Sequence, residues 1–156
     1  MTTADIQKAL YLHYSQTGWL YLSNLRTGVG YAECCSQYID GWAFSEFRRN
    51  KISHLMRAFE IKVNLVDTKV ELQNPDKRWL AYSVSHEFYF VAPVGLIDKK
   101  LLSKNDGLIE VDGTYLHIVK RALQREIMPP RWSFVGSIIR NIKNVELKTN
   151  EGKEEK

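Results

Sequence analysis

The sequence predicts a mixed α/β domain, and three patterns support this prediction. Apolar residues recur at helical spacing near the start of the chain, short strand-like runs follow, and a second helical stretch separates the third run from the fourth. The chain has 156 residues, of which 44% are hydrophobic and 26% charged, so it has the size and composition of one globular domain. The order helix, three strands, helix, strand and trailing hairpin is typical of helices covering a mixed sheet.

The first half of the chain is expected to supply one helix and three strands. Apolar residues recur at helical spacing over 3–16, and Gly18 follows as the helix end. Three strand-like segments come next, at 19–25, 33–44 and 55–65. Alternation along the second segment predicts one face formed by Tyr38, Asp40, Trp42 and Phe44.

The second half begins with a polar helical stretch over 67–81. The pair Asn74-Pro75 interrupts this stretch, because a proline breaks a helix or begins a new one. The elements expected after it are a buried strand at 87–92, a short helix at 96–102, and a hairpin of strands 107–111 and 114–120. Asp112-Gly113 is a strong two-residue signal for the turn of that hairpin.

The chain changes character after residue 121. We expect a folded domain over 1–121, a linker over 122–132, a C-terminal helix over 133–147 and a disordered charged tail over 148–156. An apolar stripe runs along the helix at Phe134, Ile138, Ile139 and Ile142. The stripe could dock on its own domain, on a second copy of the chain or on another protein, which makes the helix a candidate interface for a homo-oligomer or a protein partner.

Composition narrows the compartment and the partners. No apolar stretch approaches the roughly 20 residues of a membrane span, and the N-terminus lacks the features of a secretory signal. We therefore expect a cytoplasmic protein with no membrane partner, in which Cys34 and Cys35 are reduced thiols. The net charge of +4 permits a polyanionic partner without requiring one.

The most informative local pattern is the acid and the base in the third strand-like segment. Side chains at i and i+2 lie on the same face of a strand, so Glu60 and Lys62 are expected side by side between bulky apolar residues. Removing such charges from water is unfavourable unless something compensates, and a divalent metal is one such compensation. Asp40, near the end of the preceding strand, is a second carboxylate for the same site.

This order of elements and residues resembles the PD-(D/E)XK nuclease superfamily. The segment Tyr38-Ile-Asp40-Gly-Trp matches the first part of the motif, and Phe59-Glu60-Ile-Lys62 matches the second. A narrower resemblance, over about residues 5–120, is to the MmcB-like branch associated with bacterial DNA repair. The segments that carry it are Phe59-Glu-Ile-Lys62, Asp76-Lys-Arg-Trp79-Leu-Ala-Tyr82 and Phe88-Tyr-Phe-Val-Ala-Pro93.

The resemblance implies a restriction-endonuclease-like core and a metal-dependent DNA nuclease, acting in DNA repair or in the processing of foreign DNA. Asp40, Glu60 and the backbone carbonyl of Ile61 would bind Mg²⁺ or Mn²⁺, which prefer oxygen ligands. Lys62 would orient or deprotonate the attacking water, or stabilise charge on the phosphate. The alternative is a catalytically inactive nuclease-fold module that binds DNA or a protein.

Basic residues around the predicted site are candidates for contacts with DNA phosphates. They are Arg48, Arg49 and Lys51 in the loop 45–53, Arg57 on the third strand, and Lys77 and Arg78 on the second helix. Each of these assignments has a competing structural explanation. The cations could belong to ordinary solvated surfaces, and Asp40 could begin a turn with Gly41. Glu60 and Lys62 could form a cross-strand ion-pair array on a solvated face.

Overall fold

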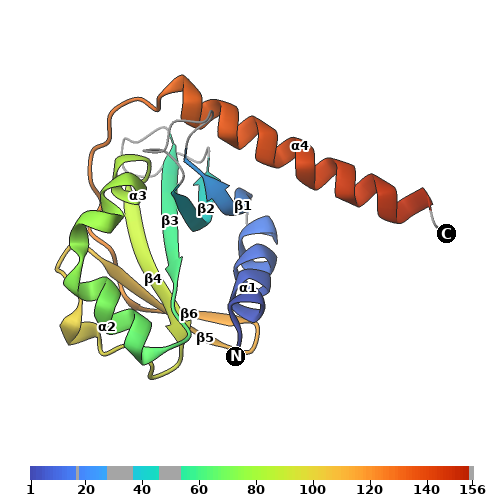
Figure 1. Ribbon diagram of the computed structural model, residues 1–156. Helices are drawn as coiled ribbons and strands as arrows, with labels where there is room; N and C mark the ends of the chain where they lie inside the picture. The colour runs from blue at the N-terminus through green and yellow to red at the C-terminus, as the bar shows by residue number, and fades with distance from the viewer. Residues whose placement is uncertain (17, 28–36, 46–53, 155–156) are drawn as a thin grey trace.

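A six-stranded mixed sheet with helices on both faces forms the body of the computed structural model (Figure 1). The structure describes residues 1–16, 18–27, 37–45 and 54–154, with side chains as far as residue 144. The strands are β1 (Trp19–Arg26), β2 (Tyr38–Ser45), β3 (Leu55–Ile61), β4 (Glu87–Pro93), β5 (Gly107–Asp112) and β6 (Tyr115–Lys120). The helices are α1 (Thr3–Gln16), α2 (Leu65–Gln73), α3 (Trp79–Ser83) and α4 (Trp132–Glu154), with 3-10 turns η2 (Pro75–Arg78) and η3 (Lys99–Leu101). The predicted α/β class is confirmed.

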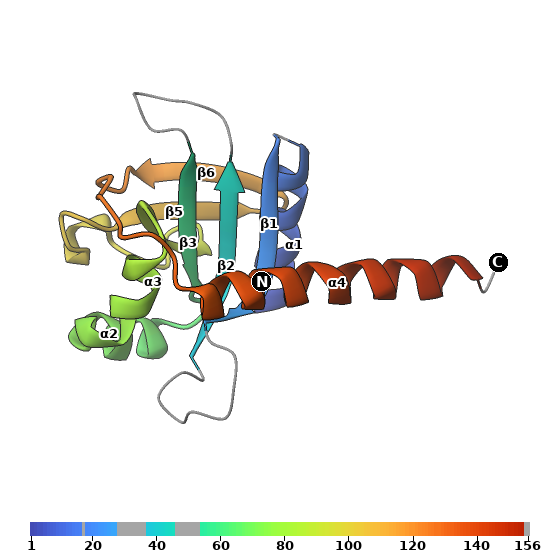
Figure 2. The same cartoon turned by 90° about the horizontal axis from the view of Figure 1, so that it is seen from above.

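The six strands lie in the sheet in the order in which they occur in the chain. β1, β2 and β3 form an antiparallel meander, β3, β4 and β5 are parallel to one another, and β6 returns antiparallel beside β5. The sheet is strongly curved, so that β5 and β6 run across the direction of β1–β3 in Figure 2. Because of this curvature, α1 contacts β1, β2 and also β6 at the far edge.

The ends of α1 agree with the sequence prediction. Thr2 and Asp5 satisfy each other's backbone amides: the Thr2 amide donates to Asp5 Oδ2 at 2.7 Å and the Asp5 amide to Thr2 Oγ1 at 3.2 Å. This reciprocal arrangement is a capping box. Gly18 follows with φ of 74°, the left-handed conformation in which glycine commonly ends a helix.

The connection from β3 to β4 differs from the predicted boundaries. β3 ends at Ile61, whereas the sequence predicted a strand as far as residue 65. Asn64 explains the difference, because its Oδ1 accepts a hydrogen bond from the Val66 amide at 2.7 Å and caps α2. The predicted break at Pro75 is confirmed, since η2 and α3 follow α2 there. The predicted short helix over 96–102 is reduced to the single turn η3.

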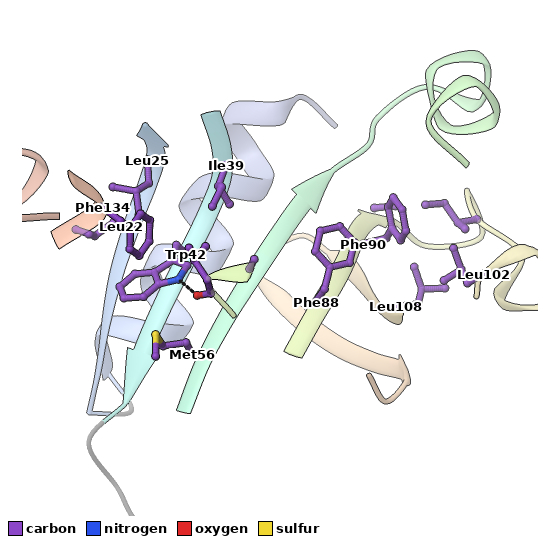
Figure 3. Close-up of a cluster of buried hydrophobic side chains, with 14 residues drawn as sticks. Leu22, Leu25, Ile39, Trp42, Met56, Phe88, Phe90, Leu102, Leu108 and Phe134 are labelled. Atoms are coloured by element: carbon purple, nitrogen blue, oxygen red, sulfur yellow. Dashed lines mark hydrogen bonds between the residues drawn. The ribbon is translucent and has the colours of Figure 1, made fainter. Parts of the chain in front are cut away.

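Each face of the sheet carries its own apolar core. One core packs α1 against Tyr21, Phe59 and Tyr89. The other lies under α3 and α4, and its buried aromatic residues include Trp42, Phe88, Phe90 and Phe134 (Figure 3). The Trp42 indole Nε1 donates to the Val84 carbonyl at 3.0 Å, so the polar atom of this large side chain is satisfied inside the core.

The C-terminal helix is longer than the sequence predicted. α4 begins at Trp132 and continues to Glu154, so the predicted disordered tail over 148–156 is wrong for 148–154. Lysine and glutamate in this segment are good helix formers, whereas Thr149, Asn150 and Gly152 are poor ones, so helix propensity alone does not explain the continuation. None of the described helices combines the length and the apolarity needed to cross a membrane.

The apolar stripe of α4 docks on its own domain. Phe134 is 3% exposed, and Ile138 and Ile142 pack against the same core, whereas Ile139 is 61% exposed. The Asn141 amide nitrogen also donates to the Ser23 carbonyl on β1 at 3.3 Å. The first half of α4 is therefore part of the fold, and the rest of the helix projects beyond the sheet (Figures 1 and 2).

Candidate functional site

Asp40 lies where β2 and β3 separate. The antiparallel pairing of these two strands stops at Gly41 and Phe59. The next amide of β3 that faces β2 belongs to Ile61, and it donates to Asp40 Oδ2 at 2.9 Å. The side chain of Asp40 thus takes the place that a backbone carbonyl of β2 would have in a continued ladder.

A distortion of β1 accompanies this separation. Asn24, which the register places opposite Asp40, has φ of 50°. Leu25 and Ile39 consequently lie in the same core as Leu22 and Trp42, although strict alternation would place them on opposite faces. The predicted shared face of Tyr38, Asp40, Trp42 and Phe44 is therefore correct for Trp42 and Phe44, which pack in one core, and wrong beyond Gly41, where the alternation breaks. The break aims the Asp40 carboxylate along the sheet toward Ile61.

Glu60 and Lys62 lie side by side, as their spacing predicted, and they form an ion pair, which was the competing structural explanation for these two residues. Lys62 Nζ lies 2.6 Å from Glu60 Oε1, and both side chains are partly buried. Lys62 Nζ also lies 3.8 Å from Oε2 of Glu71, which reaches the site from α2. The lysine is therefore shared between a carboxylate of the strand and a carboxylate of the helix.

Arg78 contacts both the backbone carbonyl and the carboxylate of Glu71. Its Nη1 donates to the Glu71 carbonyl at 2.8 Å and lies 3.9 Å from Glu71 Oε1, while its Nε donates to the Tyr82 hydroxyl at 3.1 Å. That hydroxyl in turn donates to Oδ1 of buried Asp106 at 2.7 Å. The guanidinium also lies over the Phe90 ring, 5.3 Å from its centroid. Arg78 is only 5% exposed, so the prediction that it contacts DNA is wrong: it is an internal brace of the site.

The electrostatics of the cluster disfavour the ionised forms of Asp40 and Glu60. Burial raises the pKa of Asp40, and the Ile61 amide and Lys62 offset this only in part. Burial and repulsion from Asp40 raise the pKa of Glu60 against the attraction of Lys62. Burial alone would lower the pKa of Lys62, but the carboxylates, Glu60 first, outweigh it and the pKa is raised. Three carboxylates face one ammonium and one guanidinium here, so one further positive charge would relieve the repulsion.

A small cavity opens beside Glu60 and Glu71. Its volume is about 30 Å³, enough for one or two water-sized ligands. The residues that line it come from the start of β2, the end of β3, and α2 to α3: Gln37, Tyr38, Ile39, Glu60, Glu71, Lys77, Arg78, Leu80 and Ala81.

The donor set suits a hard divalent cation held partly by water. Asp40 and Glu60 each keep carboxylate lone pairs beyond the hydrogen bond or ion pair that they make. The Ile61 carbonyl points toward β2, as its amide does, because both groups of one residue face the same neighbour in an antiparallel strand. Within the described residues, no group of three or more His, Cys, Asp or Glu side chains is placed to share a metal. A cation here would rely on two carboxylates, the carbonyl and water.

The other predicted DNA contacts fall in different places. Arg57 Nε lies 2.7 Å from Glu87 Oε2, and its guanidinium lies over the Trp19 ring. It packs with Tyr14 and Tyr89 of the α1 core, on the face opposite Glu60, so the predicted DNA contact of Arg57 is wrong. Lys77 is exposed and lines the cavity. Arg48, Arg49 and Lys51 lie outside the described residues.

Glu71 is the site residue that the sequence pattern missed. A lone glutamate in a polar helix carries no local signal, and its importance depends on how α2 docks beside β3. The spacing Glu71 to Arg78 spans the Asn74-Pro75 break, which removes any helical periodicity that could have linked the two residues.

Comparisons with known proteins bear on the fold. No protein-family model matches the chain, and no curated protein matches it. The structure is similar to that of SPO1766, a protein of unknown function from Silicibacter pomeroyi, with a TM-score of 0.65 and 14% sequence identity. The match covers 94% of this chain and 92% of that one. At this identity the similarity shows a shared fold and assigns no activity.

Proposed function

We propose that this chain is a metal-dependent DNA nuclease of the PD-(D/E)XK superfamily, in its MmcB-like branch, that hydrolyses phosphodiester bonds in DNA repair or in the processing of foreign DNA. The observation that carries the proposal is the Asp40 carboxylate held against the Ile61 amide, next to the Glu60–Lys62 pair. One acid and one acid–base pair thus meet where two strands separate. An acid beside an acid–base pair is what the motif calls for, and this supports the proposal.

The arrangement of elements supports a restriction-endonuclease-like core. A helix, an antiparallel meander, a helical crossover and a parallel fourth strand follow one another in the expected order. The site lies at the ends of β2 and β3, beside the start of the crossover. This is the position that the resemblance assigns to the two halves of the motif.

The proposed roles follow from the positions of the side chains. Asp40, Glu60 and the Ile61 carbonyl would hold Mg²⁺ or Mn²⁺, and the bound ion would polarise the phosphate and activate water. Lys62 stays protonated at neutral pH because its pKa is raised. It is therefore suited to stabilise negative charge on the phosphate or to orient water rather than to remove a proton. Glu71 limits the positions of Lys62 by attracting it from the other side.

One observation favours the second candidate, a catalytically inactive nuclease-fold module that binds DNA or a protein. Glu60 and Lys62 lie 2.6 Å apart and satisfy each other's charge without a metal. If that pair persists in the presence of Mg²⁺, Glu60 is not available as a ligand. The two candidates therefore differ in whether a divalent cation can displace the Lys62 ammonium from Glu60.

A cleavage assay separates the two functions. Single-stranded, duplex and branched DNA are incubated with the protein and Mg²⁺ or Mn²⁺, and wild type is compared with Lys62→Ala. The nuclease predicts metal-dependent cleavage that Lys62→Ala abolishes while the variant keeps its circular dichroism spectrum. The matched control is Lys69→Ala, an exposed lysine of α2, which should cleave like wild type. Cleavage that survives in Lys62→Ala, or no cleavage by wild type, refutes the proposed activity.

A further inference from the structure

An exposed aromatic side chain and an exposed cation both line the site cavity. Tyr38, at the start of β2, lines the cavity and is 61% exposed. Lys77 lines it from η2, and its side chain is also exposed. None of the ion pairs formed among the described side chains uses Lys77. Glu60 and Glu71 line the same cavity.

The size of the cavity limits what can enter it. A volume of about 30 Å³ admits water or a phosphate oxygen, whereas a nucleobase is several times larger. A nucleotide whose phosphate reaches Glu60 must therefore keep its base outside, against the residues of the opening. The exposed Tyr38 ring offers a stacking surface there, and exposed Lys77, which lines the same cavity, offers a contact for a neighbouring phosphate.

From this geometry we propose that the site takes single-stranded DNA, with one unstacked base on the Tyr38 ring and a flanking phosphate on Lys77. The inference rests on the proposed function for the choice of DNA and adds the strand form of the substrate. In a duplex each base is already stacked on its neighbours. Stacking on the Tyr38 ring would first require that a base be unstacked from the duplex, which costs free energy. A single strand offers its bases freely, and stacking on an aromatic ring tolerates any base.

The test measures binding without cleavage. Fluorescence anisotropy in EDTA compares three labelled probes: a 12-nucleotide oligo-dT, an oligo-rU of the same length and a hairpin duplex of similar length. Tyr38→Ala is expected to weaken binding of the single strand by about 5- to 100-fold, because one base–aromatic stack is lost. Tyr38→Phe keeps the ring and is expected to bind within about twofold of wild type. Tyr11→Ala is the matched control, since Tyr11 is 53% exposed on α1 and does not line this cavity.

The salt dependence of binding by Lys77→Ala is an independent test of the phosphate contact. Removing one phosphate contact should make the slope of log affinity against log salt concentration shallower by about 0.7 for the single strand. Duplex binding should be the same for wild type, Tyr38→Ala and Tyr38→Phe.

Several outcomes overturn the inference. Three concern the variants: an unchanged oligo-dT affinity in Tyr38→Ala, a loss of oligo-dT affinity in Tyr38→Phe equal to that in Tyr38→Ala, or a loss of duplex affinity in Tyr38→Ala equal to its loss of oligo-dT affinity. Two concern wild type: no binding of oligo-dT, or tighter binding of oligo-rU than of oligo-dT of the same length. Different results test the nuclease proposal and this inference. Single-strand binding that depends on Tyr38 without any cleavage refutes the activity alone, whereas cleavage that is insensitive to Tyr38→Ala, together with unchanged binding, refutes this inference alone.

Discussion

The Asp40 carboxylate and the Ile61 amide make the side-chain hydrogen bond that ends the pairing of β2 with β3. This bond, 2.9 Å long, fixes one oxygen of Asp40, Oδ2, against β3. Strand geometry places the Ile61 carbonyl on the same side as its amide. The site is therefore a consequence of where the sheet stops pairing, and its properties should respond to changes of charge and packing at that point.

The charge of Asp40 should reduce stability when no metal is present. Because burial raises its pKa in the folded state, the favourable protonated form is available only at low pH and is lost as pH rises through the folded pKa. Asp40→Asn keeps an oxygen for the Ile61 amide and removes the charge. We expect the free energy of unfolding of Asp40→Asn to exceed that of wild type by roughly 0.5–2 kcal/mol at pH 7.5 in EDTA.

Urea unfolding at several pH values checks this prediction. The difference between the two proteins should shrink as the pH falls toward the ordinary aspartate pKa of about 3.9. An Asp40→Asn variant that is less stable than wild type at pH 7.5 would show that the charge is compensated within the fold.

A side chain at Gly41 should destabilise the fold. A Cβ at this position would lie 2.6 Å from the Tyr21 hydroxyl and 3.2 Å from Cδ2 of Phe59, both inside the α1 core. Gly41→Ala is expected to lower the free energy of unfolding by about 1–3 kcal/mol. The Tyr21 hydroxyl is buried, and none of the described residues hydrogen-bonds to it, so Tyr21→Phe should recover part of this loss in the double variant. Equal stability of Gly41→Ala with and without Tyr21→Phe would contradict this explanation.

His86 should make the protein less stable in mild acid. Its Nδ1 accepts the Met56 amide at 3.1 Å, which requires the neutral ring, and burial lowers its pKa. The unfolded chain therefore takes up a proton that the folded state resists, and stability falls as pH drops below about 6.5. His86→Asn, which offers an oxygen to the same amide, should flatten the stability curve between pH 6.5 and 5.

The exposed His117 is the control for this measurement. His117→Asn should leave the pH dependence of thermal unfolding as in wild type. A His86→Asn variant with the full wild-type pH dependence would place its origin elsewhere.

The docking of α4 should contribute to the stability of the whole domain. Phe134 is buried against Trp42 in an edge-to-face contact with 5.6 Å between ring centroids. Phe134→Ala is expected to lower the free energy of unfolding by about 3–5 kcal/mol. Ile139→Ala, an exposed position on the same helix, should change it by less than about 0.5 kcal/mol. Similar small effects in chemical denaturation of both variants would indicate that α4 is not part of the cooperative unit.

Local patterns in the sequence predicted the elements that depend on neighbouring residues. The bounds of α1 follow from Thr2 and Gly18, the break after α2 from Pro75, and the Glu60–Lys62 pair from the two-residue period of a strand. These features need no knowledge of what packs against them.

The parts that sequence did not predict depend on distant contacts. The sequence around Arg78 predicts an exposed cation on a polar helix. In the structure Arg78 is buried, because Glu71, Tyr82 and Phe90 surround it. The sequence likewise makes Arg57 a candidate phosphate contact, but in the structure Arg57 forms an ion pair with Glu87 of the neighbouring parallel strand. The distortion at Asn24 that reorients Asp40 follows from tertiary packing and has no signature in the sequence.

Titration calorimetry of Mn²⁺ into the folded protein tests the central claim most directly. If Asp40 and Glu60 hold a divalent cation, wild type should bind Mn²⁺, and Asp40→Asn and Glu60→Gln should each weaken binding at least about tenfold. Asp67→Asn, an exposed position on α2, should bind like wild type. Absence of binding by wild type, or equal binding by Asp40→Asn, would contradict a metal site at the separation of β2 and β3.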